Sequence, residues 1–158
     1  MKRKKPPQDH TSEVTPPGEV TARVIGYVRS PYKERFGTPR QPTVTEQVLE
    51  DRALDATIEL LPGHNFEQAL QDLERFDYIW VVVWLHLNDN WKPTVIPPRG
   101  PKERRGLFAT RSPHRPNPIG LSALRLLKVE GRVLHVRGID LLDGTPVLDI
   151  KPYLPYAD

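Results

Sequence analysis

The chain has 158 residues, a length that suits a single domain with its own hydrophobic core. Cysteine is absent, which excludes disulfides, a cysteine nucleophile and an iron–sulfur cluster held by thiolates. The net charge is only +3, and the 37% of hydrophobic residues stand beside 18 prolines, so we expect a modest core with many connections.

Missing patterns argue against several common classes of site and location. The five histidines include no close pair at a zinc-ligand spacing, so we expect no metal site. The sequence contains neither Gly-x-Gly-x-x-Gly nor Gly-x-x-x-x-Gly-Lys, so a Rossmann or P-loop enzyme would need atypical motifs. The most apolar window, 78–87, is too short to span a bilayer, and the N-terminus lacks the apolar core of a signal peptide. We therefore expect a soluble, cytoplasmic protein with no membrane segment.

The N-terminal third reads as a tail followed by two strands. Residues 1–18 are basic and rich in proline, which predicts a disordered tail that either solubilises the protein or tethers nucleic acid. We assign the remainder, 19–158, to one β-barrel domain. Residues 19–30 and 56–62 are rich in β-branched side chains with loose alternation, which predicts strands. The polar, proline-containing segment 31–47 between them is too long for a simple turn and is a candidate binding loop.

The segment 64–76 carries the only good helical pattern in the chain. Its apolar residues are spaced by three and four positions, which places them on one face of a helix. Asn65 is a suitable N-cap for that helix. The apolar residues are Phe66, Ala69, Leu70, Leu73 and Phe76.

The rest of the chain predicts strands. Residues 77–88 form a nearly continuous apolar run, typical of a strand buried on both faces or of a central barrel strand. Gly131 and the pair Asp143-Gly144 mark two hairpins. Many strands and one main helix favour a mostly β fold, a single-sheeted antiparallel barrel. Further strands are expected at 94–99, 105–112, 119–131, 132–143 and 145–155.

A rigid and basic loop connects two of these predicted strands. It lies in the stretch RGLFATRSPHRPNPIGLSAL at 105–124. Pro113, Pro116 and Pro118 each fix φ and remove one N–H donor, so the loop is stiff before anything binds. Stiffness lowers the entropy lost on binding and suits a ligand site, although a simple turn between strands remains an alternative. Basic residues crowd the region from Pro97 to Pro116, which suggests a polyanion such as nucleic acid, or else a solvated face.

Five segments, in order, carry a family resemblance: IGYVRSPYKERFGTPRQP, FDYIWVVVWLHLN, WKPTVIPPR, RGLFATRSPHRPNPIGLS and DLLDGTPVLDIKPYLPYAD. Together they cover residues 24–158 and resemble the TrmO-like (TsaA-like, YaeB-like) family of tRNA methyltransferases. The block ATRSPHRPNPIG is long and of unusual composition, which makes the resemblance specific. The resemblance implies that bacterial members continue past KPYLPYAD into a smaller C-terminal domain, which we do not expect among residues 1–158.

The resemblance implies an enzyme that transfers a methyl group from S-adenosylmethionine to N6 of threonylcarbamoyladenosine, beside the anticodon of tRNA. It also implies a homodimer. Two other functions remain open: a non-catalytic RNA-binding barrel, and a small-molecule methyltransferase of the same fold. Transfer from a sulfonium depends on positioning and needs neither a metal nor a covalent intermediate, so a chain without cysteine can perform it.

Functional residues follow from the resemblance and from the chemistry. The resemblance assigns the cofactor to Arg40, Gln41, His86, Leu87, Arg111, Leu121, Ile139, Asp140, Leu141 and Leu142. An arginine such as Arg111 can pair with the methionine carboxylate. Loss of the N6 proton calls for a base or a relay, for which the sequence offers four candidates without choosing among them: Asp140, Asp143, Asp149 and His114. The residues expected to contact RNA are Arg99, Lys102, Arg104, Arg105 and Arg115.

Overall fold

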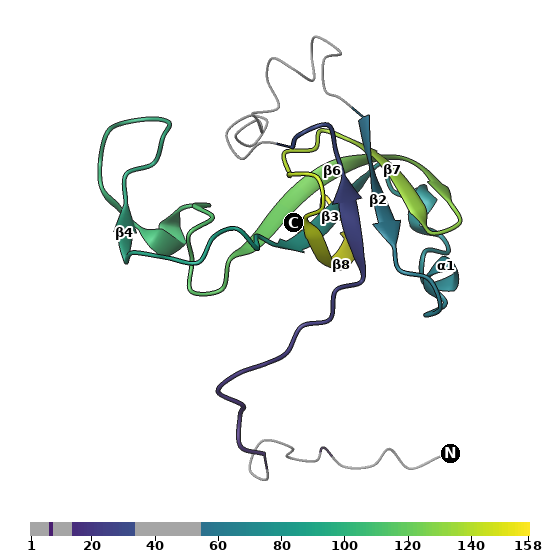
Figure 1. Cartoon of the computed structure of the whole chain (residues 1–158), viewed down its shortest axis with the longest axis horizontal. Helices are drawn as coiled ribbons and strands as arrows, with labels where there is room; N and C mark the ends of the chain where they lie inside the picture. The colour runs from purple at the N-terminus through teal and green to yellow at the C-terminus, as the bar shows by residue number, and fades with distance from the viewer. Residues whose placement is uncertain (1–6, 8–13, 34–54) are drawn as a thin grey trace.

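A closed barrel of six antiparallel strands forms the body of the molecule (Figure 1). This computed structural model describes residues 7, 14–33 and 55–158. Around the barrel the strands follow the order β1, β2, β7, β6, β3, β8, and pairing between β1 and β8 closes it. The predicted fold, a mostly β single-sheeted barrel, is confirmed. The strands are β1 (Gly26–Arg29), β2 (Asp55–Leu60), β3 (Tyr78–Trp84), β6 (Ile119–Glu130), β7 (Val133–Arg137) and β8 (Pro146–Pro152).

The core fills the barrel with one face of each strand. In β3 the residues Ile79, Val81 and Val83 are fully buried, while Trp80 and Val82 between them lie on the outer face and stay half-buried. Successive side chains of a strand point to opposite faces, so the apolar run at 78–84 covers both sides of one barrel strand. The core therefore explains half of this run, and the outer half needs another explanation.

The hairpin at Gly131 joins β6 to β7, as expected, and the glycine there has φ 58°. The second expected hairpin is wrong. Asp143 and Gly144 lie between β7 and β8, and these two strands are not neighbours in the barrel. The segment instead crosses one end of the barrel, where the Ser30 N–H donates to Asp143 Oδ1.

The predicted helix is much shorter than its apolar pattern. Helix α1 spans only Phe66–Ala69, and a separate turn of 3-10 helix, η1, spans Leu73–Arg75. Asp72 has φ 68°, a left-handed conformation at the N-cap of η1 that prevents α1 and η1 from joining into one helix. Asn65 stands at the N-cap position but donates its amide to the Gln68 side chain instead of accepting from a backbone N–H. Leu70, the C-cap residue of α1, is buried in the core, and Phe66 and Leu73 pack against the core beside it.

A long connection between β3 and β6 forms an arm that projects from the barrel, at the left of Figure 1. We call residues 88–118 the arm. It contains the two-residue strands β4 (Thr94–Val95) and β5 (Arg105–Gly106), which pair with each other, and the 3-10 turn η2 (Leu107–Ala109). The strands predicted at 94–99 and 105–112 are thus reduced to a short ribbon: Pro97 and Pro98 follow β4 closely, and η2 begins directly after β5.

Candidate functional site

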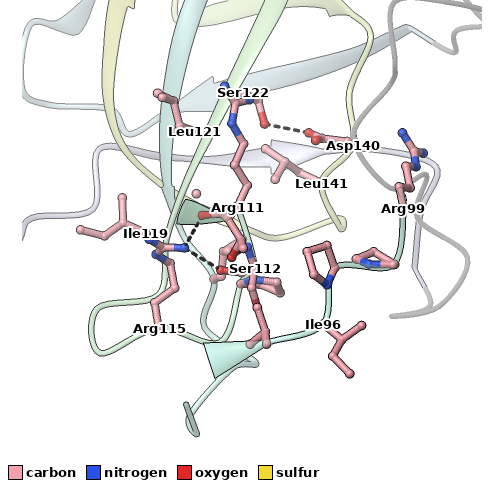
Figure 2. A pocket seen from close by; sticks show the side chains of 17 residues that line it. Ile96, Arg99, Arg111, Ser112, Arg115, Ile119, Leu121, Ser122, Asp140 and Leu141 are labelled. Carbon is pink, nitrogen blue, oxygen red and sulfur yellow. Dashed lines mark hydrogen bonds between the residues drawn. The ribbon is translucent and has the colours of Figure 1, made fainter. Parts of the chain in front are cut away.

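A pocket of about 680 Å³ lies where the arm joins the barrel. One wall is the arm segment 95–99, and the opposite wall is the loop 110–115 (Figure 2). The floor comes from the start of β6 at 119–122 and from Asp140 and Leu141, which follow β7. Three distant parts of the sequence therefore meet at one site because β6 pairs with β7 and the arm enters β6 directly.

A largely buried polar pair, Ser122 with the half-buried Asp140, lies in the floor of this pocket. Ser122 faces inward from β6, is 7% exposed, and donates its hydroxyl to Asp140 Oδ1 at 2.7 Å. Burial raises the pKa of the Asp140 carboxyl, while the Ser122 hydroxyl and the Arg111 charge oppose that rise. Figure 2 shows the Arg111 side chain extending towards Ser122 and Asp140. The pocket thus offers a carboxylate and a guanidinium on one side of an apolar space.

The apolar part of the pocket comes from aliphatic and proline side chains. Leu85 follows β3, Leu121 lies on β6, and Ile96 with its neighbouring prolines comes from the arm. Gly120 brings the floor close to the barrel, since a Cβ there would lie 2.8 Å from Val83 Cγ2. A mostly apolar cavity of this size with a few convergent polar groups is typical of a small-molecule site.

The structure brings four of the expected cofactor residues together as pocket lining: Arg111, Leu121, Asp140 and Leu141. Two others do not line the pocket. Ile139 is buried in the core, with 3% of its surface exposed, and the Leu142 carbonyl accepts a hydrogen bond from the Thr145 hydroxyl. His86 and Leu87 are exposed in the turn after β3, where their neighbour Leu85 lines the pocket instead. Arg40 and Gln41 lie outside the described residues.

The four candidate bases differ in position. Asp140 alone among them lines the pocket. Asp143 is engaged by the Ser30 N–H, and Asp149 lies beside Lys151, with 2.9 Å between its Oδ2 and the lysine Nζ. His114 is half-buried within the proline-rich loop and does not line the pocket.

The residues expected to contact RNA divide into two groups. Arg99 and Arg115 line the pocket. Lys102, Arg104 and Arg105 are exposed on the arm, where Arg104 donates to the Thr94 hydroxyl and Arg105 pairs with Glu103 at 2.8 Å.

Sequence reasoning missed Ser122. A signal was present, because Ser122 lies two residues before Leu124 and four before Leu126, and so shares the inward face of β6 with these buried leucines. A lone hydroxyl on the inward face of an apolar strand needs a partner, and that partner is Asp140. Three apolar lining residues that were also missed, Leu85, Ile96 and Ile119, carry no pattern that separates them from ordinary apolar residues.

Two negative findings apply to residues 7, 14–33 and 55–158. They contain no group of three or more histidine, aspartate or glutamate side chains arranged to hold a metal ion. Over the same residues, no helix is long and apolar enough to cross a membrane.

Comparison with known proteins gives consistent relatives. Residues 27–158 match the family described as the tRNA-methyltransferase O N-terminal domain. The tRNA (adenine(37)-N6)-methyltransferase of Escherichia coli strain K12 is 43% identical over 141 residues, covering 85% of this chain and 57% of that protein. A "probable S-adenosyl-L-methionine-binding protein" of Pyrococcus abyssi is 40% identical over 136 residues, covering 86% of this chain and 69% of that protein.

A solved structure agrees with these sequence relatives. The crystal structure of TrmO from Pseudomonas aeruginosa matches with a TM-score of 0.69 and 44% identity, over 89% of this chain and 58% of that chain. The chain therefore spans a little over half the length of the bacterial relatives it matches. These matches confirm the resemblance inferred from the motifs: the chain belongs to the family of the tRNA-methyltransferase O N-terminal domain.

Proposed function

We propose that this protein uses S-adenosylmethionine to methylate N6 of threonylcarbamoyladenosine, next to the anticodon of tRNA. The observation that carries the proposal is the Arg111–Asp140 pocket, whose lining residues all fall within the matched range 27–158. Family relatives bear the names of tRNA methyltransferases and of S-adenosylmethionine-binding proteins. Because tRNA is the substrate, we place the protein in the cytoplasm.

The pocket chemistry suits the cofactor. The Arg111 guanidinium can hold the methionine carboxylate in a two-point contact, and Asp140 can accept hydrogen bonds from ribose hydroxyls or from an amine. The aliphatic and proline walls can cover the adenine ring and exclude water. S-adenosylmethionine supplies an electrophilic methyl group on a sulfonium.

Methyl transfer then depends on alignment and on one proton. A bond forms between N6 and the methyl carbon while the carbon–sulfur bond breaks, and its electron pair stays on sulfur. The N6 proton must leave, and the carbamoyl group makes that proton more acidic. Of the four candidate bases we favour Asp140, because it lies in the pocket and its raised pKa makes it a stronger base than an ordinary aspartate.

We propose a homodimer, supported by two exposed apolar features of this chain. The outer face of β3 and β6 presents Trp80, Val82 and Leu121 side by side, and Leu121 is 44% exposed. The arm presents Phe108, which is 79% exposed, and Ile96. A short ribbon such as β4–β5 has little stability alone and gains it by packing against another surface. A second copy would cover both features at once and close the pocket.

The test is a methyl-transfer assay on matched tRNA transcripts, with and without the threonylcarbamoyl group, followed by mass spectrometry of the nucleosides. We expect methylation of the modified transcript alone, because donors placed for the carbamoyl side chain are left unpaired by plain adenosine. Arg111→Ala is expected to weaken S-adenosylmethionine binding by about 1.5–3 kcal/mol. Arg111→Lys should recover only part of the lost affinity, since an ammonium group lacks the planar pair of donors that a guanidinium offers to a carboxylate.

Other outcomes would select another function. Tight tRNA binding without measurable cofactor binding would indicate a non-catalytic RNA-binding barrel. Cofactor binding without salt-dependent tRNA affinity would indicate a small-molecule methyltransferase. An Arg111→Ala variant with unchanged cofactor affinity would remove Arg111 from the site.

A further inference from the structure

Arg115 turns its side chain back into its own loop. One terminal nitrogen, Nη1, lies 2.9 Å from the Thr110 carbonyl oxygen, 3.2 Å from that of Ser112 and 3.4 Å from that of Leu107. The nitrogen carries two hydrogens, so three acceptors share them and the Thr110 carbonyl takes the strongest bond. Arg115 Cζ also lies 5.6 Å from the centroid of the Phe108 ring. Figure 2 shows this side chain beneath the pocket wall that Arg111 and Ser112 form.

The sequence of the loop explains why it needs such a donor. Three prolines between Pro113 and Pro118 carry no N–H, so the loop has fewer backbone donors than carbonyl acceptors. Thr110 makes up for part of this shortage of donors, because its hydroxyl and its N–H both donate to the Leu107 carbonyl. Arg115 Nη1 supplies the carbonyls of Thr110 and Ser112, and it adds a longer third contact to the Leu107 carbonyl.

We propose that Arg115 is a positioning residue of the cofactor pocket and not an RNA contact. It holds the segment 107–112 so that Arg111, between two of the carbonyls it binds, projects into the pocket towards Asp140. A phosphate contact that drew Nη1 away would leave the Thr110 and Ser112 carbonyls without this donor, whereas the Leu107 carbonyl would keep its bonds from Thr110. The inference rests on the proposed function for the identity of the ligand, S-adenosylmethionine.

The experiment compares Arg115→Ala, Arg115→Lys and Arg104→Ala in the full chain. Arg104 is a matched control, an exposed arginine on the arm that donates to the Thr94 hydroxyl. Three quantities are measured well below the unfolding temperature: the Kd for S-adenosylmethionine, the salt dependence of tRNA binding, and amide hydrogen exchange of residues 107–112 without ligand. Guanidinium ion is then added to Arg115→Ala at a concentration that leaves the fold intact.

We expect Arg115→Ala to weaken cofactor binding about tenfold and to speed exchange in 107–112, with the salt slope for tRNA unchanged. Arg115→Lys keeps the charge and the apolar stem, so it should fold, but one ammonium cannot replace the fork and should restore only part of the affinity. Added guanidinium should also restore part, which a general loss of stability would not allow. Arg104→Ala should show the opposite pattern, a shallower salt slope with unchanged cofactor affinity.

The result that overturns the inference is a shallower salt slope for Arg115→Lys or Arg115→Ala with unchanged cofactor affinity, which would make Arg115 an RNA contact. Unchanged affinity, slope and exchange in both variants would also overturn it. If the unsubstituted protein does not bind S-adenosylmethionine, the proposed function fails. The exchange data on the free protein then still decide whether Arg115 holds the loop.

Discussion

The Ser122–Asp140 pair determines how the pocket should respond to pH. The folded protein holds Asp140 at a raised pKa, so it binds a proton more readily than the unfolded chain does. Stability therefore falls as pH rises from the unfolded pKa through the folded one, because above that point the buried carboxylate is charged. Ligand binding has the opposite sign, since only the carboxylate accepts hydrogen bonds with both oxygens.

We predict that S-adenosylmethionine affinity is lost as pH falls through the raised pKa of Asp140. In Ser122→Ala the hydroxyl that favours the charged form is gone, so affinity should be lost at a higher pH than in the unsubstituted protein. Ser122→Thr keeps the hydroxyl and is the matched control. Calorimetric titrations across the acid range measure the midpoint. A midpoint that is the same in all three proteins would show that Asp140 takes no part in binding.

At the scale of the elements, β3 and β6 carry more apolar surface than the barrel needs. Their inward residues complete the core, and their outward residues Trp80, Val82, Ala123 and Leu121 face one another across the pair. Sequence reasoning predicted the strand but could not divide its apolar residues between two faces. That division needs the register, which only the folded barrel fixes.

The outer face yields a prediction about assembly. Val82→Lys puts a positive charge in the centre of this face. Its cross-strand neighbour on β8 is Asp149, whose carboxylate can pair with the lysine, so the barrel itself should tolerate the substitution. If a second copy covers the face, the substitution should convert a dimer into a monomer, because burying the lysine charge at an interface costs several kcal/mol of desolvation. Light scattering measures the mass.

Thr57→Lys is the control, since Thr57 lies on β2 between the exposed residues Asp55 and Glu59. It should leave the mass unchanged. A monomer already in the unsubstituted protein at full methyl-transfer activity would refute the dimer. Equal unfolding temperatures of the two variants would show that the fold survives.

At the scale of the whole molecule, the sequence predicts the barrel well and the pocket only in part. Alternation along 119–130 and the turn at Gly131 are local signals, and both appear in the structure. The helix at 64–76 fails because Asp72 adopts a left-handed conformation, which the apolar spacing does not reveal. The joining of Ser122 with Asp140 depends on the pairing of β6 with β7, and that of Arg115 with the Leu107 carbonyl depends on the path of the loop; neither follows from a local pattern.

The exposed arginines of the arm lie apart from the pocket lining, and they allow a last prediction. Arg104 and Arg105 are exposed on the arm, outside the pocket lining, and their partners there are the Thr94 hydroxyl and Glu103. Each phosphate contact releases counterions, so replacing both arginines with alanine should lower the slope of log affinity for tRNA against log salt by about 2. Cofactor affinity should not change, because neither residue lines the pocket.

The matched control replaces Arg29 and Arg75, two arginines in exposed ion pairs outside the arm, with alanine. This variant carries the same net charge as the arm variant, so a general attraction between a basic protein and tRNA would lower both slopes equally. If the arm contacts tRNA, the slope should fall in the arm variant and stay unchanged in the control variant. Filter binding over a range of salt concentrations, with S-adenosylmethionine titrated in parallel, separates the two cases. Equal slopes in the two double variants would remove the arm from the tRNA-binding surface and leave the pocket rim, with Arg99, as the nearest basic group to test.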